Sequence, residues 1–514
     1  ILFMFSFILF FIGKFYSYNA MLSGILILWI HNIIYAFEKK NSRMFFLVFN
    51  LVVFFFLIGR PTINMIKGNV WGYYNVESVH FALNSLIITL LCLFAGEYFL
   101  EHMIIKRTNI NFTTDTLEKS PVFHCSPRSG KEKPHEQLAF FKSNGYKEPA
   151  VCKSDFIFAL RNISLILFYF SCVFVFIIEM EKLLYMGGKD YLEFYTSFKT
   201  NLPCVIIAIG GMYKYFLCIF LSTWPKKSTA FFPLMIYVLL AVPDLLIGIR
   251  NPVVLNAVFV LLYYFIRDAV GDKEKWLGFF EKFIITLLTP IAVAVLGAYN
   301  YIRDTESSTK ITKNFFDLIV DFIYKQGVSF ETLCIGYESI PKIKYTGFTN
   351  YTFGGIIDYF KYSKTAQILW GGLSFGEGNN LSRALYSNSF AHRMSYTALG
   401  QEYLNGHGLG SSYILETFAD FGYSGIIVFS ILMGMFLAAM IYIIKGGNAG
   451  FIFVLVSLTS IYFCPRDGAT MWISFLFYLH FLLPFVLCYV LAKLCVKRYF
   501  CSDIAVSFEK SHMG

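Results

Sequence analysis

With 514 residues, of which 57% are hydrophobic, 19% aromatic and only 15% charged, this chain is too apolar for an ordinary soluble protein. The composition therefore predicts a protein that is embedded in a membrane. The formal net charge of +10 does not indicate nucleic-acid binding, because no DNA- or RNA-binding motif accompanies it.

Apolar runs close to the roughly 20 residues that a membrane-crossing helix needs recur along the whole chain. They predict an all-α polytopic membrane protein with about twelve transmembrane helices, near residues 1–13, 20–37, 44–59, 79–100, 156–178, 202–222, 230–248, 252–267, 283–301, 422–444, 450–464 and 470–492. The first run is short. Because the sequence opens at Ile1 without a methionine, we expect that its true start is missing and that no signal peptide was cleaved.

The distribution of positive charge gives these helices a direction across the membrane. When they alternate with the N-terminus inside, 23 of the 43 Lys and Arg residues fall on the cytoplasmic side and eight in the short outer loops. Lysine and arginine accumulate in cytoplasmic loops, so we expect both termini in the cytoplasm. The chain then divides into transmembrane helices 1–4 (residues 1–105), a basic cytoplasmic loop (106–155), helices 5–9 (156–301), a large extracytoplasmic loop (302–421), helices 10–12 (422–492) and a cytoplasmic tail (493–514).

The basic loop contains residue types that bind metals, namely His124, Cys125, His135 and Cys152. Their spacing matches no zinc pattern, so we expect no metal there and no cofactor in the protein. We expect a basic segment that faces anionic lipid.

Four arginines are predicted to meet at the outer membrane surface. Arg250 stands in a tight turn between two apolar runs, and Arg466 occupies a second outer turn. Arg383 and Arg393 belong to the large outer loop, and we expect them above the same surface. A guanidinium binds phosphate oxygens through two hydrogen bonds and keeps its proton, so such a cluster suits a diphosphate. In the alternative interpretation, each arginine reaches the lipid headgroups on its own.

The large outer loop is polar but rich in aromatic residues, including Tyr351, Tyr359, Trp370 and Phe375. A loop of this length between membrane spans is usually functional. Its aromatic faces suit sugar rings, and they equally suit a small core that rests the loop on the lipid interface. The sequence leaves both interpretations open.

A glycine-rich run joins this loop to the next hydrophobic span. Gly408 and Gly410 allow the backbone to bend and expose its amides, and Ser411 or Ser412 is placed to cap the helix that follows. Free amides at a helix start can bind an anion such as phosphate without a special side chain. The run therefore predicts an anion site at the edge of the membrane.

The helix that follows carries two carboxylates, Glu416 and Asp420, four residues apart and therefore on one face. The run Gly408-Leu409-Gly410-Ser411-Ser412-Tyr413-Ile414 with Glu416, followed by Asp420-Phe421-Gly422-Tyr423 and Gly425, resembles the O-antigen polymerase (Wzy-type) family of polysaccharide repeat-unit polymerases. The segment Gly248-Ile249-Arg250 and the large outer loop support this resemblance, which covers the chain from about residue 200 to 490.

The resemblance implies a GT-C-like, metal-independent glycosyltransferase of the bacterial plasma (inner) membrane. Such an enzyme transfers a glycan chain from undecaprenyl diphosphate to the non-reducing end of a lipid-linked repeat unit at the outer face, and so builds the O-antigen of lipopolysaccharide or a capsule. The implied partners are the undecaprenyl-diphosphate-linked oligosaccharide, the lipid bilayer and a chain-length regulator protein. Carried over to this sequence, Arg250, Arg383, Arg393 and Arg466 hold the diphosphates with help from the amides of Gly408, Gly410, Ser411 and Ser412, while His407, Glu416 and Asp420 are available as the base.

Two alternative functions remain open at this point. An O-antigen ligase differs mainly in its acceptor, a lipid A core, and a flippase or other transporter would also have about twelve helices. Transporters usually show two related halves and ionisable residues near the membrane midplane. The two halves of this chain differ, and Lys214 is the only deep charge that favours transport.

Overall fold

The structure is a computed structural model that describes residues 2–68, 71, 74–105, 153–187, 193–194, 197–272, 274–303, 314–343, 349–376 and 378–512. The described residues form helices and turns without a strand, and eleven of their helices are long and apolar enough to cross a membrane. The predicted all-α polytopic fold is therefore confirmed. The candidate metal ligands of the basic loop, from His124 to Cys152, lie outside the described residues.

The first two helices of the N-terminal group form a hairpin. The bounds of the group are α1 (Leu2–Tyr16), α2 (Tyr18–Glu38), α3 (Met44–Val53), the π-helical turn η1 (Phe54–Ile58), α4 (Gly59–Ile66), α5 (Val76–Phe99) and the π-helical turn η2 (Leu100–Ile105). α3, η1 and α4 together form one span. The first expected span is α1, whose 15 residues are apolar but fewer than a full crossing needs.

A second group of helices follows the basic loop. It comprises α8 (Lys153–Met186), α10 (Cys204–Gly211), α11 (Tyr213–Ser222), α12 (Lys227–Leu239), α13 (Val242–Leu246), α14 (Asn251–Val270) and α15 (Phe279–Arg303). α10 and α11 form one span, and so do α12 and α13.

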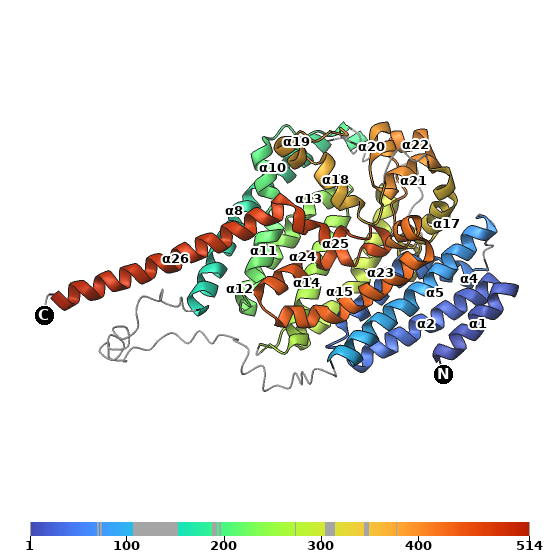
Figure 1. The fold of residues 1–514 in the computed structure, drawn as a ribbon, viewed down its shortest axis with the longest axis horizontal. Helices are drawn as coiled ribbons and strands as arrows, with labels where there is room; N and C mark the ends of the chain where they lie inside the picture. The colour runs from blue at the N-terminus through green and yellow to red at the C-terminus, as the bar shows by residue number, and fades with distance from the viewer. Residues whose placement is uncertain are drawn as a thin grey trace.

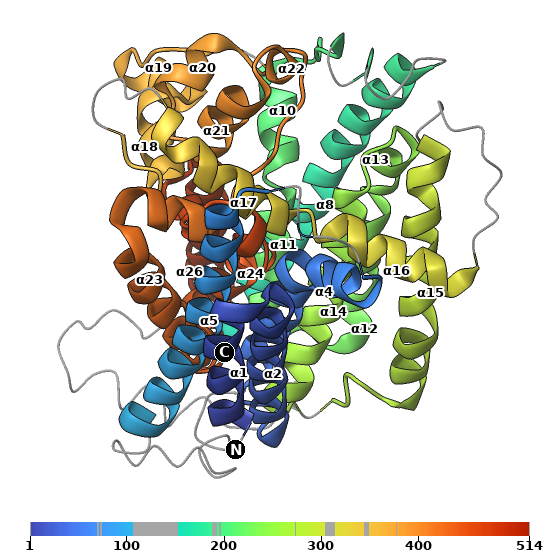
Figure 2. The ribbon, with the colours of Figure 1, turned by 90° about the vertical axis from the view of Figure 1, so that its right-hand side faces the viewer.

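The described part of the predicted large loop contains short helices joined by turns and irregular segments. The helices are α16 (Phe315–Gln326), α17 (Ser329–Ser339), η3 (Ile340–Lys342), α18 (Gly354–Tyr362), α19 (Lys364–Trp370), α20 (Leu381–Tyr386), α21 (Phe390–Leu399) and α22 (Gln401–Leu404). Figures 1 and 2 show α18 to α22 gathered over one end of the bundle, and Figure 2 shows the N-terminus at the opposite end. We call residues 354–404 the cap.

The C-terminal helices are α23 (Tyr413–Lys445), α24 (Asn448–Ile461), η4 (Cys464–Arg466), α25 (Met471–Ser474), η5 (Phe475–Phe477) and α26 (Leu479–His512). α23 joins two helices across a kink at Gly422, where φ is 64° and ψ is −154°. The first of them begins at Tyr413 and is capped by Ser412, and the span expected from residue 422 lies after the kink. One boundary differs from the expected spans: the helix expected from residue 470 begins at Leu479, because residues 464–477 form short turns beneath the cap.

Two glycines allow α5 and α23 to approach each other closely, and the two helices lie side by side in Figure 2. A Cβ on Gly96 would lie 2.1 Å from the backbone oxygen of Ile431, and a Cβ on Gly434 would lie 2.2 Å from that of Leu93. Small residues give membrane helices such backbone contacts, because dispersion and not the hydrophobic effect drives helix association in lipid. The pair therefore fixes the distance between α5 and α23, the helix whose first turns reach the cap.

We predict that Gly434→Leu destabilises the folded protein by about 1–3 kcal/mol, because its side chain would enter the backbone of α5. Gly211→Ala is the control, since its Cβ would make only ordinary contact, 3.6 Å from a His480 ring carbon. Thermal unfolding of the detergent-solubilised variants measures the effect. Equal midpoints for the two variants would show that the close contact contributes nothing.

Candidate functional site

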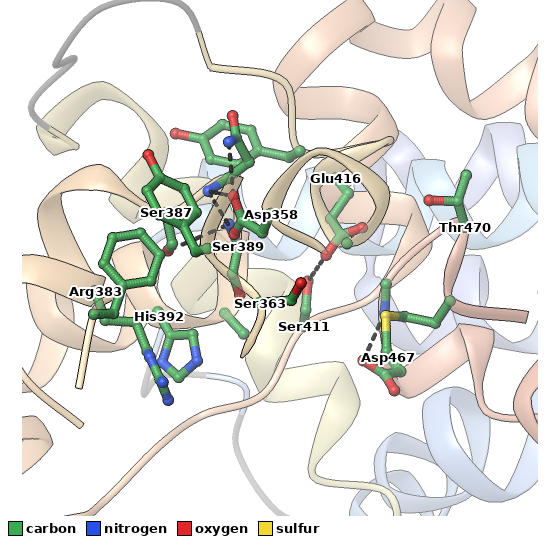
Figure 3. Close-up of a pocket in the computed structure, with 18 residues that line it drawn as sticks. Asp358, Ser363, Arg383, Ser387, Ser389, His392, Ser411, Glu416, Asp467 and Thr470 are labelled. Carbon is green, nitrogen blue, oxygen red and sulfur yellow. Dashed lines mark hydrogen bonds between the residues drawn. The ribbon is translucent and has the colours of Figure 1, made fainter. Parts of the chain in front are cut away.

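A cavity of about 450 Å³ lies where the cap meets the start of α23. Its walls come from the turn at residues 351–355, from α18, α20 and α21, from the first residues around α23, and from the segment 467–471. Figure 3 shows the side chains that line it, with Asp358, Glu416 and Asp467 among them. Segments far apart in the sequence therefore converge on one polar site.

Glu416 is held firmly in the wall of this cavity. Its side chain lies on the first turn of α23 and is only 6% exposed. One carboxylate oxygen, Oε1, accepts a hydrogen bond from the Ser411 hydroxyl at 3.0 Å, and Oε2 accepts one from the Ala469 amide at 2.8 Å. Two hydrogen bonds leave lone pairs on a carboxylate, so Glu416 can still accept a proton from a bound hydroxyl group.

The glycine-rich run positions this carboxylate through its backbone. Gly410 has φ 77°, a left-handed conformation that favours glycine, and Ser412 then caps α23 by accepting a hydrogen bond from the Ile414 amide at 3.3 Å. The predicted cap is therefore confirmed for Ser412, whereas Ser411 bonds to Glu416. Within the same run, the Leu409 amide donates to the Ser395 hydroxyl at 3.0 Å, so this amide already has a partner.

Asp420 holds a wall of the cavity and does not line the cavity itself. Its carboxylate accepts hydrogen bonds from the Tyr351 amide at 3.1 Å and from the Thr352 amide and hydroxyl at 2.7 Å each. These bonds tie the start of α18 to the same helix that carries Glu416. The arrangement gives Asp420 a positioning role.

Asp358 forms another wall of the cavity together with the chain around Asn388. Its carboxylate accepts hydrogen bonds from the Asn388 backbone and side-chain amides, at 2.8 to 3.0 Å. Burial raises the pKa of Asp358, although these amides act in the opposite direction. Arg393 is buried behind this wall, where its Nε donates to the Ser387 carbonyl at 2.8 Å.

The structure separates the four predicted arginines. Arg383 lines the cavity and donates from Nη2 to the Gly376 carbonyl at 3.0 Å. Arg466 directly precedes the cavity residue Asp467, and its Nη1 donates to the Gln326 side chain at 2.9 Å. Among the described residues, no carboxylate lies within 4.0 Å of either guanidinium. Of these two charges, that of Arg383 faces the cavity, while that of Arg466 lies beside it.

Arg250 and His407 lie elsewhere. The guanidinium of Arg250 donates to the Leu296 carbonyl of α15 at 3.4 Å, and Arg250 does not line the cavity. His407 is exposed beyond α22, with its Nε2 3.5 Å from the carboxylate of Glu402. The cavity thus brings together Glu416, Ser411 and Arg383 from the predicted site.

Sequence reasoning missed several residues that line the cavity. Asp467 follows Arg466 in the turn after α24, and that neighbouring position was the one available signal for it. Burial raises the pKa of the Asp467 carboxyl. His392 comes from α21, and burial, with a contribution from the charge of Arg383, lowers the pKa of its imidazole to about 4. No local pattern marks His392 or Asp358, because both reach the site through folding of the cap.

Lys214, the deep charge, lies where α11 packs against α24. Its ammonium donates a hydrogen bond to the Thr459 hydroxyl at 2.9 Å.

In the part of the chain that the structure describes, no group of three or more His, Cys, Asp and Glu side chains is arranged to hold a metal ion.

The fold and the cavity define a polytopic integral membrane protein with a polar, carboxylate-bearing site at one end of its bundle. This protein belongs to the O-antigen polysaccharide polymerase Wzy family, since the model of that family matches residues 1–499. The match confirms the resemblance and extends it over the N-terminal half. No curated protein and no solved structure matches the chain. Membership indicates a membrane-bound polysaccharide polymerase with glycosyltransferase-type activity.

We predict that the protein loses stability in acid partly through His392. Its imidazole has a pKa of about 4 when folded and 6.5 ordinarily, so below pH 6.5 protons bind preferentially to the unfolded chain. The contribution of neutral His392 is complete above pH 6.5 and is lost as the pH falls towards 4. The unfolding midpoint of His392→Gln should therefore fall less between pH 7.5 and pH 5 than that of the parent protein.

The control for this comparison is His407→Gln, which changes an exposed histidine of the same region. Its unfolding midpoint should show the full decline of the parent protein. A decline of the same size in both variants would contradict the role of buried His392.

Proposed function

We propose that this protein extends a bacterial surface polysaccharide, an O-antigen or a capsule, at the outer face of the plasma membrane. The growing chain leaves undecaprenyl diphosphate and joins the non-reducing end of a lipid-linked repeat unit. The observation that carries the proposal is the cavity beneath the cap, which is lined by both the Glu416 carboxylate and the Arg383 guanidinium. Membership of the polymerase family supports the reaction class.

Glu416 is the proposed base. Of the three carboxylate and imidazole candidates, Glu416 alone lines the cavity, while Asp420 and His407 do not. A hydroxyl of the acceptor sugar gives its proton to the carboxylate as its oxygen bonds to the anomeric carbon of the donor. The bond from that carbon to the diphosphate oxygen breaks, and the electron pair leaves with the diphosphate.

Arg383 and Arg466 are the proposed partners of the leaving diphosphate. Both lie at or beside the cavity without a carboxylate partner among the described residues, so their charges can stabilise the negative charge that develops on the diphosphate. Because two guanidinium groups can supply this charge, we propose a metal-independent transfer. Arg393 supports the wall from behind.

The aromatic side chains of the cavity suit a sugar acceptor. The rings of Tyr362 and Phe375 lie 3.9 Å apart between their centroids, and Tyr351 lines the same space. Such apolar faces bind the C–H faces of sugar rings, while the carboxylates bind hydroxyl groups. The cavity therefore supports binding of an oligosaccharide.

The membrane orientation belongs to the same proposal. The cap lies at the end of the bundle opposite the N-terminus (Figure 2), and the excess of Lys and Arg supports a cytoplasmic N-terminus. Together they support a cap, and a cavity, outside the cytoplasm. We place the protein in the bacterial plasma (inner) membrane with both termini in the cytoplasm, and a chain-length regulator is a further proposed partner.

We predict that Glu416→Gln strongly slows polymerisation by purified protein in liposomes supplied with cognate undecaprenyl-diphosphate-linked repeat units. The amide keeps the size of the side chain but cannot accept the proton. The rate at which the ladder of longer glycans forms should therefore fall by about 10²–10⁴-fold. Glu402→Gln, a change of an exposed cap carboxylate, is the control and should keep the parent rate.

The products of the same assay separate the alternatives. A full ladder from Glu416→Gln would remove Glu416 as the base. Transfer to added lipid A core in place of a ladder would indicate a ligase, and movement of lipid between leaflets without a new glycosidic bond would indicate a flippase.

We predict that Arg466→Ala lowers the rate of chain transfer by about a hundredfold, because the leaving diphosphate loses a positive partner. Arg466→Lys should recover part of the rate, since lysine keeps the positive charge but cannot form the bidentate hydrogen bonds of a guanidinium. Lys364→Ala on the exposed surface of α19 controls for the loss of any cation from the cap. An unchanged rate in Arg466→Ala would contradict the assignment.

A further inference from the structure

The cavity beneath the cap has more carboxylates than cations among the side chains that line it. The carboxylates are those of Asp358, Glu416 and Asp467, and Arg383 supplies the single guanidinium. His392 adds no charge at pH 7, because the pKa of its imidazole is about 4. Three negative charges and one positive charge give the lining a formal charge of −2.

The protein wall does not cancel the charge of these carboxylates. All three accept hydrogen bonds from neutral donors, namely the Asn388 amides for Asp358, the Ser411 hydroxyl and the Ala469 amide for Glu416, and the Gly468 amide, at 2.8 Å, for Asp467. Among the described residues, no lysine or arginine nitrogen lies within 4.0 Å of any of them. Their negative charge is therefore presented to whatever occupies the cavity.

Several hydrogen-bond donors of the lining are already used inside the wall. The Ser411 hydroxyl donates to Glu416, the Thr470 hydroxyl donates to the Thr352 carbonyl, and the Asn388 side-chain amide donates to Asp358. An ionised carboxylate can only accept hydrogen bonds, and each of its oxygens has more than one lone pair. A ligand at these walls must therefore bring its own donors, which are hydroxyl or ammonium groups.

The single guanidinium lies apart from the proposed base. Figure 3 shows Arg383 beside His392 at one side of the cavity, and Glu416 with Asp467 at the other side. Arg383 is held at its place by the hydrogen bond from its Nη2 to the Gly376 carbonyl. An acidic group on a sugar at Glu416 would therefore meet carboxylates and not the guanidinium.

Gly468 keeps the Glu416 carboxylate open to the cavity. A Cβ at residue 468 would lie 3.1 Å from Oε2 of Glu416 and 3.3 Å from its Oε1. Gly468 lines the cavity, and the residue before it is Asp467, which lines the cavity as well. A sugar whose hydroxyl reaches Glu416 past Gly468 therefore comes close to Asp467.

We propose that this cavity selects an acceptor whose non-reducing sugar bears hydroxyl or ammonium groups and no acidic group, with Asp467 and Asp358 as the specificity-determining residues. The inference rests on the proposed polymerase function, because it concerns the acceptor of that reaction. A uronic acid or a phosphorylated sugar would place like charges side by side and would leave the carboxylates without donors, and both effects reject it.

The test uses the full chain in liposomes with two lipid-linked repeat units as acceptors. One is the unit that accumulates in cells lacking the gene for this protein, and the other is a synthetic copy whose terminal sugar carries a carboxylate at C6. The natural unit is the donor in every sample. The lipid of the acceptor is isotopically labelled, because only the acceptor keeps its lipid in the product. Labelled product therefore reports which unit was extended.

We expect the parent protein to extend the carboxylate copy about a hundredfold more slowly than the natural unit. Asp467→Asn removes one negative charge and supplies a donor, so it should narrow this difference to about tenfold. Asp358→Asn is the second variant, and its difference should narrow in the same direction. Glu402→Gln, which removes an exposed carboxylate outside the cavity, is the control and should keep the hundredfold difference.

Equal rates with the two acceptors in the parent protein would overturn the inference and leave the polymerase function standing. A carboxylate or phosphate on the terminal sugar of the accumulated unit, read by mass spectrometry, would also overturn it. A hundredfold difference that neither aspartate variant narrows would contradict the assignment to these two residues. No labelled product from the natural unit would contradict the polymerase function itself, and the inference would fall with it.

Discussion

The hydrogen bonds of the Glu416 carboxylate join the parts of the chain that make the site. One oxygen is bonded to the residue before the helix cap and the other to the segment after α24, so the start of α23 is fixed against residues 467–471. One helical turn further on, Asp420 binds the turn that begins α18, and the Thr470 hydroxyl donates to the Thr352 carbonyl at 2.7 Å. The cap, α23 and the turn after α24 are thereby held in one arrangement.

The kink at Gly422 divides α23 according to its surroundings. The turns before Gly422 carry buried polar groups whose hydrogen bonds are made within the protein, as a helix close to lipid requires. The turns after it are apolar and pack against α5 through Gly434. A residue with a side chain would be strained at a φ of 64°, so glycine allows the helix to change direction between the membrane and the site.

The sequence predicts the spans well, because apolar runs of about 20 residues are a local property of the chain. It also offers Ser411 or Ser412 as the cap and Glu416 as one of three candidate bases, since a glycine-rich run before an acidic helix is visible in one segment; in the structure Ser412 is the cap and Glu416 lines the cavity. Asp358 and His392 escape prediction because their places depend on how the cap folds over α23. The predicted meeting of four arginines depended on the same tertiary packing, which places Arg250 at α15 and Arg383 in the cavity.

The central claim is that sugar transfer takes place in the cavity beneath the cap. The most direct measurement is a cryo-EM structure of the Glu416→Gln variant in lipid nanodiscs with its lipid-linked repeat unit bound. The account predicts density for sugar rings beside Tyr362 and Phe375, with the terminal hydroxyl close to residue 416 and the diphosphate towards Arg383 or Arg466. Glycan density outside the cavity, with residue 416 buried and remote from any sugar, would contradict it.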